Sequence, residues 1–316
     1  MSEVIRVDNL VKQYKRTEVP SVNNITFHVE EGELFAFLGP NGAGKTTTIS
    51  ILTTTLSKTS GNVSIAGYDL DHEAKRIRSN IGIIFQNPSL DLELTAEENI
   101  RLHAGTYGAY QFRPFYRMMD SSYKQRIEEL AEVIGLKDDL NKKLMTYSGG
   151  MKRKLEIIRS LIHHPKILFL DEPTQGLDAA SRQSLWEYLN MVRKEENITI
   201  FLTTHYLEEA EGADRICIMN QGKLEITGTP DQLKSRLIEK YMYVAANEQS
   251  VLKSELSGLG VEFIETSEGL KVMYQEPTPQ QLLLRLTTPL TKLIIYQPSL
   301  EEAYLDLIKE GSTIPC

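Results

Sequence analysis

The sequence is poor in cysteine. Only two occur in 316 residues, Cys217 and Cys316. Two cysteines are too few for the disulfide scaffold on which small secreted proteins depend. Cys217 lies in an apolar run and is expected to be a small buried residue rather than a reactive thiol. Disulfide bonds are therefore not expected to hold this fold together.

Long apolar runs are also absent. No stretch approaches the roughly 18 residues that a membrane-spanning helix needs. The first ten residues, MSEVIRVDNL, do not have the pattern of a secretory signal peptide. We expect a soluble, cytoplasmic protein. If it works at a membrane, another chain must supply the spanning segments.

The chain has no excess of positive charge. It carries 35 Lys and Arg against 43 Asp and Glu, a net charge of -8. This balance disfavours nucleic acid as the main partner. The composition, 41% hydrophobic and 25% charged, is typical of a globular protein. The length fits two or three domains.

The most informative stretch is Gly39–Thr46, which reads GPNGAGKT. It fits the phosphate-binding pattern G-x-x-x-x-G-K-[ST], and residues 34–38 and 46–56 predict the strand before it and the helix after it. In such a loop Lys45 reaches the β- and γ-phosphates and Thr46 offers its hydroxyl to Mg²⁺. An ordinary glycine-rich turn is the alternative, and the terminal Lys-Thr speaks against it. The expected ATP-binding residues here are Gly39, Pro40, Asn41, Gly42, Ala43, Gly44, Lys45, Thr46 and Thr47.

Two further strands end in polar residues. Residues 81–85 predict a central parallel strand followed by Gln86, and residues 166–170 a buried strand followed by Asp171 and Glu172. Open α/β sheets bind ligands at such carboxyl ends. Asp171 is expected to hold Mg²⁺, directly or through water, and Glu172 to polarise the attacking water. Gln86 either binds Mg²⁺ or that water, or it only hydrogen-bonds backbone.

Two ring side chains have two interpretations each. His205 follows a predicted buried strand at residues 199–204. A lone histidine is usually structural, but this position favours contact with a ligand. Tyr14 ends the first predicted strand, residues 5–14. It either stacks on an adenine or is a half-buried strand residue, and the local sequence favours the second.

A second anion-binding geometry is predicted at Tyr147–Met151. Its sequence YSGGM precedes a helix predicted at residues 152–162, so Ser148 and two glycines lie at a helix N-terminus. The basic run Lys152–Lys154 is interpreted as a solvated helix face.

Residues 87–119 carry two local features. Thr95 and Glu98 have the spacing of a capping box, which predicts a helix start. The segment Tyr107–Met119 gathers aromatic and Met side chains among few charges. It either faces a partner or packs locally, and the sequence does not choose between these.

These pieces together resemble the nucleotide-binding subunit of an ATP-binding-cassette (ABC) transporter. In the order of that family they are the A-loop Tyr14, the Walker A loop Gly39–Thr46, the Q-loop Gln86, the signature Tyr147–Met151, the Walker B residues Ile167–Asp171 with Glu172, the D-loop Gly176–Asp178 and the switch His205. They span roughly three quarters of the chain, to about Leu233. The resemblance implies that Tyr14 stacks on adenine and that Ser148, Gly149 and Gly150 contact ATP.

The signature departs from the usual LSGGQ of the family. Met151 replaces a polar residue, which puts any ribose contact at that position in doubt, while Ser148 and both glycines are kept. The form YSGGM, together with the sequence SLEE from Ser299, resembles the bacterial and archaeal drug-resistance exporter branch.

The resemblance implies an α/β P-loop NTPase fold over residues 1–236, with a mixed sheet core, an antiparallel subdomain and a helical subdomain at about 87–160. It implies ATP hydrolysis with Mg²⁺, an ATP sandwich with a second copy or a related cassette chain, and transmembrane permease subunits as partners. The chain would then lie on the inner face of the cell membrane. An importer ATPase and a soluble clamp serving translation or DNA repair are the alternatives. Such clamps usually have two cassettes or a long coiled-coil insertion, and this chain has neither.

Residues 237–316 are predicted to form a separate accessory domain. Strands are expected at 241–246, 261–266, 270–274 and 293–297, and helices at 251–259, 279–286 and 299–309. The order β-α-β-β-α-β is that of a ferredoxin-like unit. Such a unit could sense a ligand, dock to a partner or join two copies, or be purely structural.

Overall fold

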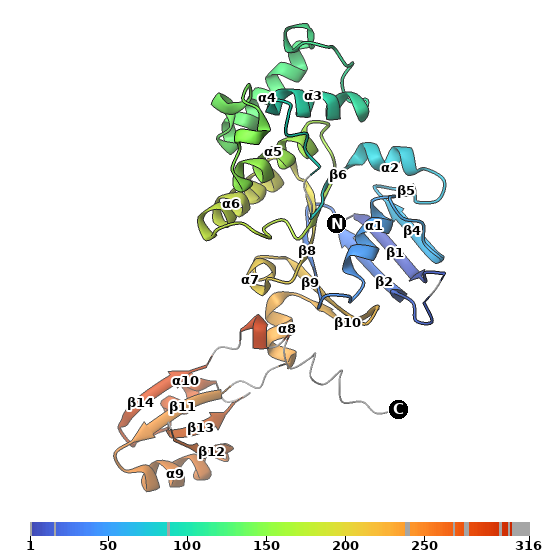
Figure 1. Ribbon diagram of the computed structural model, residues 1–316. Coiled ribbons are helices and arrows are strands. Elements are labelled where there is room, and N and C mark those ends of the chain that lie inside the picture. The colour runs from blue at the N-terminus through green and yellow to red at the C-terminus, as the bar shows by residue number, and fades with distance from the viewer. Residues whose placement is uncertain are drawn as a thin grey trace. The chain divides into compact units, whose positions relative to one another are not determined.

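The computed structural model describes residues 2–15, 17–86, 89–237, 241–267, 269–274, 278–296, 299–302 and 304, with the side chains of 235–237 left out (Figure 1). The chain divides into two compact units, Met1–Thr227 and Gly228–Cys316. The sequence predicts a domain boundary after residue 236. In the structure it comes nine residues earlier, so the short helix α8 (Pro230–Leu237) belongs to the second unit.

The first unit contains a small antiparallel sheet in the order β2-β1-β4-β5. Its strands are β1 (Glu3–Lys12), β2 (Val22–Glu30), β4 (Ser60–Ile65) and β5 (Tyr68–Asp69). Ile5 and Val7 are buried by ordinary strand alternation. A register shift follows Val7, and Asn9 has a φ of 51°, so that Leu10 rather than Asn9 enters the core.

A larger sheet holds the centre of the first unit in the order β10-β9-β3-β8-β7-β6. Its strands are β3 (Leu34–Leu38), β6 (Ile81–Ile84), β7 (Ile167–Asp171), β8 (Thr199–Thr204), β9 (Arg215–Asn220) and β10 (Lys223–Gly228). All but β10 run parallel. The strand predicted at residues 81–85 is parallel as expected, but the prediction that it is central is wrong, because β6 ends the sheet order. Every residue of β3, β7 and β8 is buried, which explains the uninterrupted apolar sequence of β3. The buried polar residues are Asp171 at the end of β7 and the three threonines of β8.

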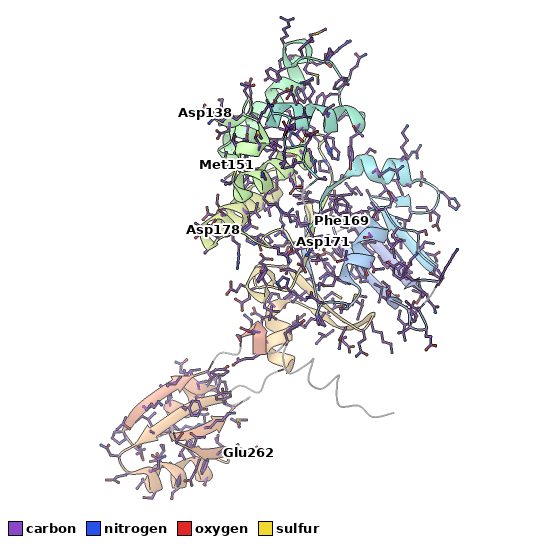
Figure 2. All side chains as sticks on the ribbon, viewed as in Figure 1. Asp138, Met151, Phe169, Asp171, Asp178 and Glu262 are labelled. Carbon is purple, nitrogen blue, oxygen red and sulfur yellow. The ribbon has the colours of Figure 1, made fainter. Side chains whose placement is uncertain are left out.

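Phenylalanine side chains join the two sheets into one core. Phe27 of β2 stacks on Phe35 of β3, with ring centroids 5.7 Å apart, and Phe201 of β8 lies 5.4 Å from Phe35. Phe169 of β7, labelled in Figure 2, continues the cluster at 5.4 Å from Phe201. The two sheets therefore share a single packed interior.

The helices of the first unit are α1 (Lys45–Leu52), α2 (Ala74–Asn80), α3 (Ala96–Thr106), α4 (Ser121–Ile134), α5 (Gly149–Leu161), α6 (Ala179–Glu196) and α7 (Leu207–Ala210). The prediction that the first helix extends to residue 56 is wrong. The Thr53 hydroxyl donates to the Ile49 main-chain carbonyl at 2.8 Å, and the Thr55 hydroxyl donates to the Ser50 main-chain carbonyl at 2.8 Å. Thr54 is left-handed, with a φ of 61°. Side-chain bonds of this kind compete with helix continuation.

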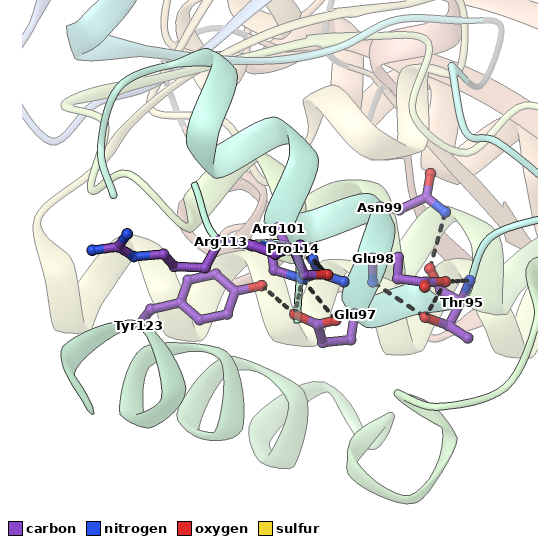
Figure 3. A network of polar contacts seen from close by, with 8 residues as sticks. All are labelled: Thr95, Glu97, Glu98, Asn99, Arg101, Arg113, Pro114 and Tyr123. Carbon is purple, nitrogen blue, oxygen red and sulfur yellow. Dashed lines mark hydrogen bonds and ion pairs between the residues drawn. The ribbon is translucent and has the colours of Figure 1, made fainter. Parts of the chain in front are cut away.

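The start of α3 confirms the predicted capping box and leads into a buried polar network (Figure 3). Glu97 and Arg101 form a buried ion pair at 2.9 Å, and the Tyr123 hydroxyl of α4 donates to Glu97 at 3.1 Å. Arg101 also donates to the main-chain carbonyls of Arg113 and Pro114 at 2.8 and 2.6 Å. The network thus fixes the irregular aromatic segment against α3 and α4.

The second unit has the predicted β-α-β-β-α-β order. Its elements are β11 (Tyr241–Ala246), α9 (Gln249–Gly258), β12 (Phe263–Thr266), β13 (Gly269–Met273), α10 (Pro279–Leu283) and β14 (Leu290–Ile295). The antiparallel sheet order β12-β13-β11-β14 is ferredoxin-like. Its core includes Met242, Val244, Leu252 and Val272. Most of the helix predicted at 299–309 lies outside the described residues.

No helix among the described residues is both long and apolar enough to cross a membrane.

Candidate functional site

The phosphate-binding loop lies between β3 and α1, as the sequence predicts. Gly44 is left-handed at a φ of 108°, and a Cβ atom there would lie 2.3 Å from the Ser21 carbonyl oxygen. A Cβ on Gly39 would lie 2.3 Å from the Met219 carbonyl oxygen. The loop therefore requires glycine at both positions because other backbone approaches so closely. It opens on a pocket of about 280 Å³ lined by Ser21, Pro40, Asn41, Gly42, Ala43, Gly44, Lys45, Thr46, Thr47, Gln86 and Glu172.

The turn between β9 and β10 fastens this loop from outside. The Gly222 N–H donates to the Ala43 carbonyl at 2.9 Å, and the Asn23 N–H donates to the Gly222 carbonyl at 2.7 Å. No sequence pattern places these segments together, since Ala43 and Gly222 are about 180 residues apart along the chain. The shape of the phosphate cradle thus depends on the edge of the larger sheet.

Lys45 is buried, with only 5% of its surface exposed. Its ammonium donates to the carbonyls of Gly39 at 2.6 Å and Pro40 at 3.2 Å. Burial lowers the pKa of Lys45, an effect opposed by the charges of Glu172 and Asp171. A buried ammonium group in a glycine-rich loop at a helix N-terminus has the chemistry of an anion-binding site. The pocket therefore fits a nucleotide phosphate.

Asp171 ends β7 at the same edge and is only 4% exposed. Burial raises the pKa of its carboxyl, and the neighbouring Glu172 charge adds to this, while a hydrogen bond from the Thr203 hydroxyl opposes it. A buried carboxylate of this kind is stabilised by a cation. Thr46 lines the phosphate pocket, and Asp171 lies close enough to the pocket residue Lys45 to affect its pKa. Together their oxygen donors fit Mg²⁺.

The Glu172 carboxylate is contacted on both oxygens. His205 Nδ1 lies 3.2 Å from Oε1, and the Gln86 amide donates to Oε2 at 3.2 Å. Gln86 also donates to Gln175 at 2.8 Å, a partner that no sequence pattern indicated. Glu172 has a φ of 48°, and its N–H is held by the Thr203 carbonyl at 3.0 Å. Three strand ends thus bring together the three residues expected to be catalytic.

The predicted signature residues lie at the start of α5. Ser148 is the N-cap, and its hydroxyl oxygen accepts from the Met151 N–H at 3.2 Å. Asp178 caps α6 by accepting from the Ser181 N–H at 2.9 Å. A Cβ on Gly150 would lie 3.0 Å from the Ser181 hydroxyl, so the two helix starts are packed together. No residue at the start of α5 or α6 lines the phosphate pocket.

Tyr14 also stands outside the residues that line the pocket. Its ring is 41% exposed, and the Lys12 ammonium lies 5.3 Å from the ring centroid. An exposed ring is available for stacking, so the adenine contact remains a prediction.

The interpretation of Arg153 as part of a solvated face is wrong. Its side chain is 6% exposed and donates to the main-chain carbonyls of Phe85 and Pro173 at 2.7 and 2.6 Å. It also pairs with Glu156 at 2.9 Å. The i,i+3 spacing of opposite charges beside Leu155 and Ile157 was the sequence feature that could have indicated burial.

Comparisons with known proteins agree with this geometry. Residues 22–175 match the family model described as ABC transporter. The chain is 33% identical to the linearmycin resistance ATP-binding protein LnrL of Bacillus subtilis, over 96% of this chain and 98% of that protein. It is 32% identical to the bacitracin transport ATP-binding protein BcrA of Bacillus licheniformis, over 99% of each. It is 34% identical to the doxorubicin resistance ATP-binding protein DrrA of Mycobacterium tuberculosis, over 80% of this chain and 74% of that protein.

Solved structures give the same picture over about three quarters of the chain. An ATP-binding subunit of an ABC transporter matches with a TM-score of 0.64 at 31% identity, over 74% of this chain and 92% of that chain. A dimeric ATP-binding cassette in a post-hydrolysis state with ADP and Pi matches with a TM-score of 0.62 at 27% identity, over 71% of this chain and 98% of that one.

Proposed function

The chain belongs to the ABC transporter family as an ATP-binding, ATP-hydrolysing subunit, and from this premise we propose that it is the motor of an exporter. The relatives named for resistance to linearmycin and doxorubicin and for bacitracin transport support export as the direction. The single observation that carries the proposal is the meeting of Gln86 and His205 on the Glu172 carboxylate beside the phosphate loop.

We assign the triphosphate of ATP to the pocket over Gly39–Thr47. The Lys45 ammonium exchanges its carbonyl partners for phosphate oxygens, which suits a buried cation better because the charges then cancel. Tyr14 stacks on the adenine from outside the loop. These interactions hold the nucleotide in one orientation before the chemical step.

Glu172 accepts a hydrogen bond from the attacking water and takes up its proton. Gln86 and His205 hold one carboxylate oxygen each and so fix the direction in which Glu172 faces the water. Thr46, Asp171 and Gln86 are the residues that would hold Mg²⁺, which when bound neutralises the negative charge on the phosphates.

The residues at the starts of α5 and α6 complete a second copy's site. Ser148, Gly149, Gly150 and Asp178 lie outside their own chain's pocket, yet Ser148 and the helix start form a donor set for phosphate. In a head-to-tail pair each signature caps the ATP of the other chain. ATP then closes the pair, and hydrolysis releases it.

The aromatic segment supports a partner surface. Phe112, Phe115 and Met118 are 47%, 57% and 50% exposed, whereas Met119 is buried, so the segment packs locally with one side and is open on the other. Arg101 holds its backbone in place. We assign a helix of a transmembrane subunit to this exposed side, since such helices dock into apolar surfaces.

The test is a pull-down of the tagged Glu172→Gln chain with ATP from detergent-solubilised membranes, with the wild-type chain without nucleotide as the control. A co-purifying polypeptide with several membrane spans, identified by mass spectrometry, supports the proposal. Ribosomes, DNA or no membrane protein would overturn it in favour of a soluble ATPase clamp.

A further inference from the structure

Three charged residues form a buried row along α5. Arg153, Glu156 and Arg159 are 6%, 1% and 9% exposed. Their spacing of three residues places them on the same face of the helix. Buried charges are costly unless they are paired and hydrogen-bonded. We call these three residues the α5 charged row. Their hydrogen-bond partners therefore show which parts of the chain the row holds in place.

The first member of the row reaches two strand ends. The Arg153 guanidinium donates to the carbonyl of Phe85 at 2.7 Å, of Pro173 at 2.6 Å and of Glu172 at 3.3 Å. Its second partner at Nη1 is the Glu156 carboxylate, at 2.9 Å. A planar guanidinium with five N–H groups can satisfy these acceptors together, and a lysine ammonium cannot.

The other members of the row hold the chain beyond Gln86. Arg159 donates to the carbonyl and the hydroxyl of Ser89 at 2.7 and 2.8 Å. Glu156 accepts from the Ser89 N–H at 3.3 Å. The α5 charged row therefore fixes the backbone at Phe85 and at Ser89, one residue before and three residues after Gln86.

The same helix begins at the signature. Ser148 caps α5, and Arg153 follows within the second turn. A helix moves as a rigid element, so a displacement at its N-terminus carries the guanidinium with it. The Glu172 backbone, at a φ of 48°, is a conformation that its surroundings must hold in place, and the Arg153 bond to its carbonyl is one such restraint.

We propose that Arg153 is a positioning residue that couples the signature at the start of α5 to Gln86 and Glu172 of the same chain. The inference rests on the proposed function, because it takes Ser148 to contact the nucleotide of a second copy. When that contact draws α5 into place, Arg153 sets the carbonyls of Phe85 and Glu172. The 3.2 Å contact between the Gln86 amide and the Glu172 carboxylate then forms in the correct geometry.

The first test compares steady-state ATP hydrolysis by the purified full chain and its Arg153→Lys variant. We expect kcat to fall about tenfold and KM for ATP to change less than about twofold, since a positioning defect acts on the chemical step. Lys154→Arg, a reverse exchange at the next, half-buried position, is the matched control and should keep wild-type kinetics. An unchanged kcat, or a loss matched by the fraction of chain that no longer binds ATP, would overturn the inference.

The second test asks whether the effect passes through the signature. Ser148→Asn removes the hydroxyl but keeps a side chain that caps α5 as well as serine does. If Arg153 carries the coupling, the double variant should lose clearly less activity than the product of the two single losses. Independent, multiplicative losses would contradict the coupling. Should Arg153→Lys fail to fold, Glu156→Gln replaces it in the same comparison of single and double variants.

The proposed function and the coupling through Arg153 are overturned by different results. A wild-type chain that does not hydrolyse ATP would overturn the proposed function and the inference with it. Wild-type hydrolysis that Arg153→Lys leaves intact would overturn the coupling alone.

Discussion

His205 and Glu172 face each other across the ends of two neighbouring parallel strands, with Nδ1 of the ring 3.2 Å from Oε1 of the carboxylate. The contact exists because β7 and β8 end within one residue of each other. Asp171, the last residue of β7, pairs with Thr203, and Glu172 and His205 each follow the last residue of their strand. The His205 side chain is 37% exposed and that of Glu172 is 11% exposed. The carboxylate is therefore shielded, and the ring stands between it and solvent.

Replacement of His205 by alanine should impair the chemical step more than nucleotide binding. The variant loses one of the two groups that contact the Glu172 carboxylate. We expect the 3.2 Å contact from His205 to tighten to a hydrogen bond when ATP is bound, and a hydrogen bond to a charged group contributes ~1.5–3 kcal/mol. We expect kcat to fall about 10- to 100-fold, with the dissociation constant for ATP nearly unchanged. Steady-state kinetics and equilibrium nucleotide binding measure the two effects. A weakened affinity with a normal kcat would contradict this role.

Glu172→Gln should bind ATP but hydrolyse it at least about 100-fold more slowly, because an amide cannot take up the proton of the attacking water. Trapped ATP should then hold two chains together, which size-exclusion chromatography with light scattering detects. Glu208→Gln is the matched control, since Glu208 has 89% of its side chain exposed. A Glu172→Gln chain that remains monomeric with saturating ATP would rule out the sandwich.

Tyr14→Ala should weaken ATP binding about tenfold, within the ~1–3 kcal/mol that base stacking on an aromatic ring contributes. Tyr14→Phe keeps the ring and should bind ATP like the wild-type chain. Titration with a fluorescent adenine nucleotide gives both affinities. If the two variants bind alike, the ring does not stack on the base.

Asp171→Asn should stabilise the nucleotide-free chain while abolishing hydrolysis. Burial raises the pKa of Asp171 above its ordinary value of 3.8, so the folded chain holds this proton more tightly than the unfolded chain does. The carboxyl therefore lowers the stability as pH rises through the raised pKa, and the loss persists at pH 7. A gain of ~1 kcal/mol raises Tm by about 2–4 °C in a unit of this size.

The pH dependence separates this effect from a general change in packing. The difference in Tm between the Asp171→Asn variant and the wild-type chain should shrink as pH falls toward and below 3.8, because only below that value is the carboxyl protonated in both states. Calorimetry between about pH 3 and 8, a range that spans the ordinary pKa of a carboxyl group, measures it. A difference that is constant over this range would contradict the electrostatic explanation.

Phe115→Ser should leave ATP hydrolysis by the isolated chain unchanged and lower the recovery of the membrane partner. Phe115 is 57% exposed on the aromatic segment, away from the residues that line the phosphate pocket. The control is Val19→Ser, a residue 68% exposed in the loop before β2. Equal recovery of the partner by both variants would mean that the aromatic segment does not form the docking surface.

Much of the fold could be predicted from local sequence. Buried parallel strands have continuous apolar runs, and the bounds predicted for β3 and β8 are those observed. The capping box predicted at Thr95 is also confirmed, and Ser299 and Glu302 make the same pair of hydrogen bonds, because such bonds join residues only three apart. The end of α1 was missed, since a run of threonines permits either helix or side-chain bonding to the backbone.

The sequence by itself determined the phosphate loop and the polar residues at the strand ends. These follow from short patterns, and parallel strands bring their carboxyl ends to one edge whatever the rest of the chain does. The tertiary structure alone decided that Arg153 is buried, that Gln175 meets Gln86, and that Ser21 and Met219 enclose the glycine loop. Those contacts join residues far apart in the chain. Periodicity gives the faces of an element, but not the surface that each face meets.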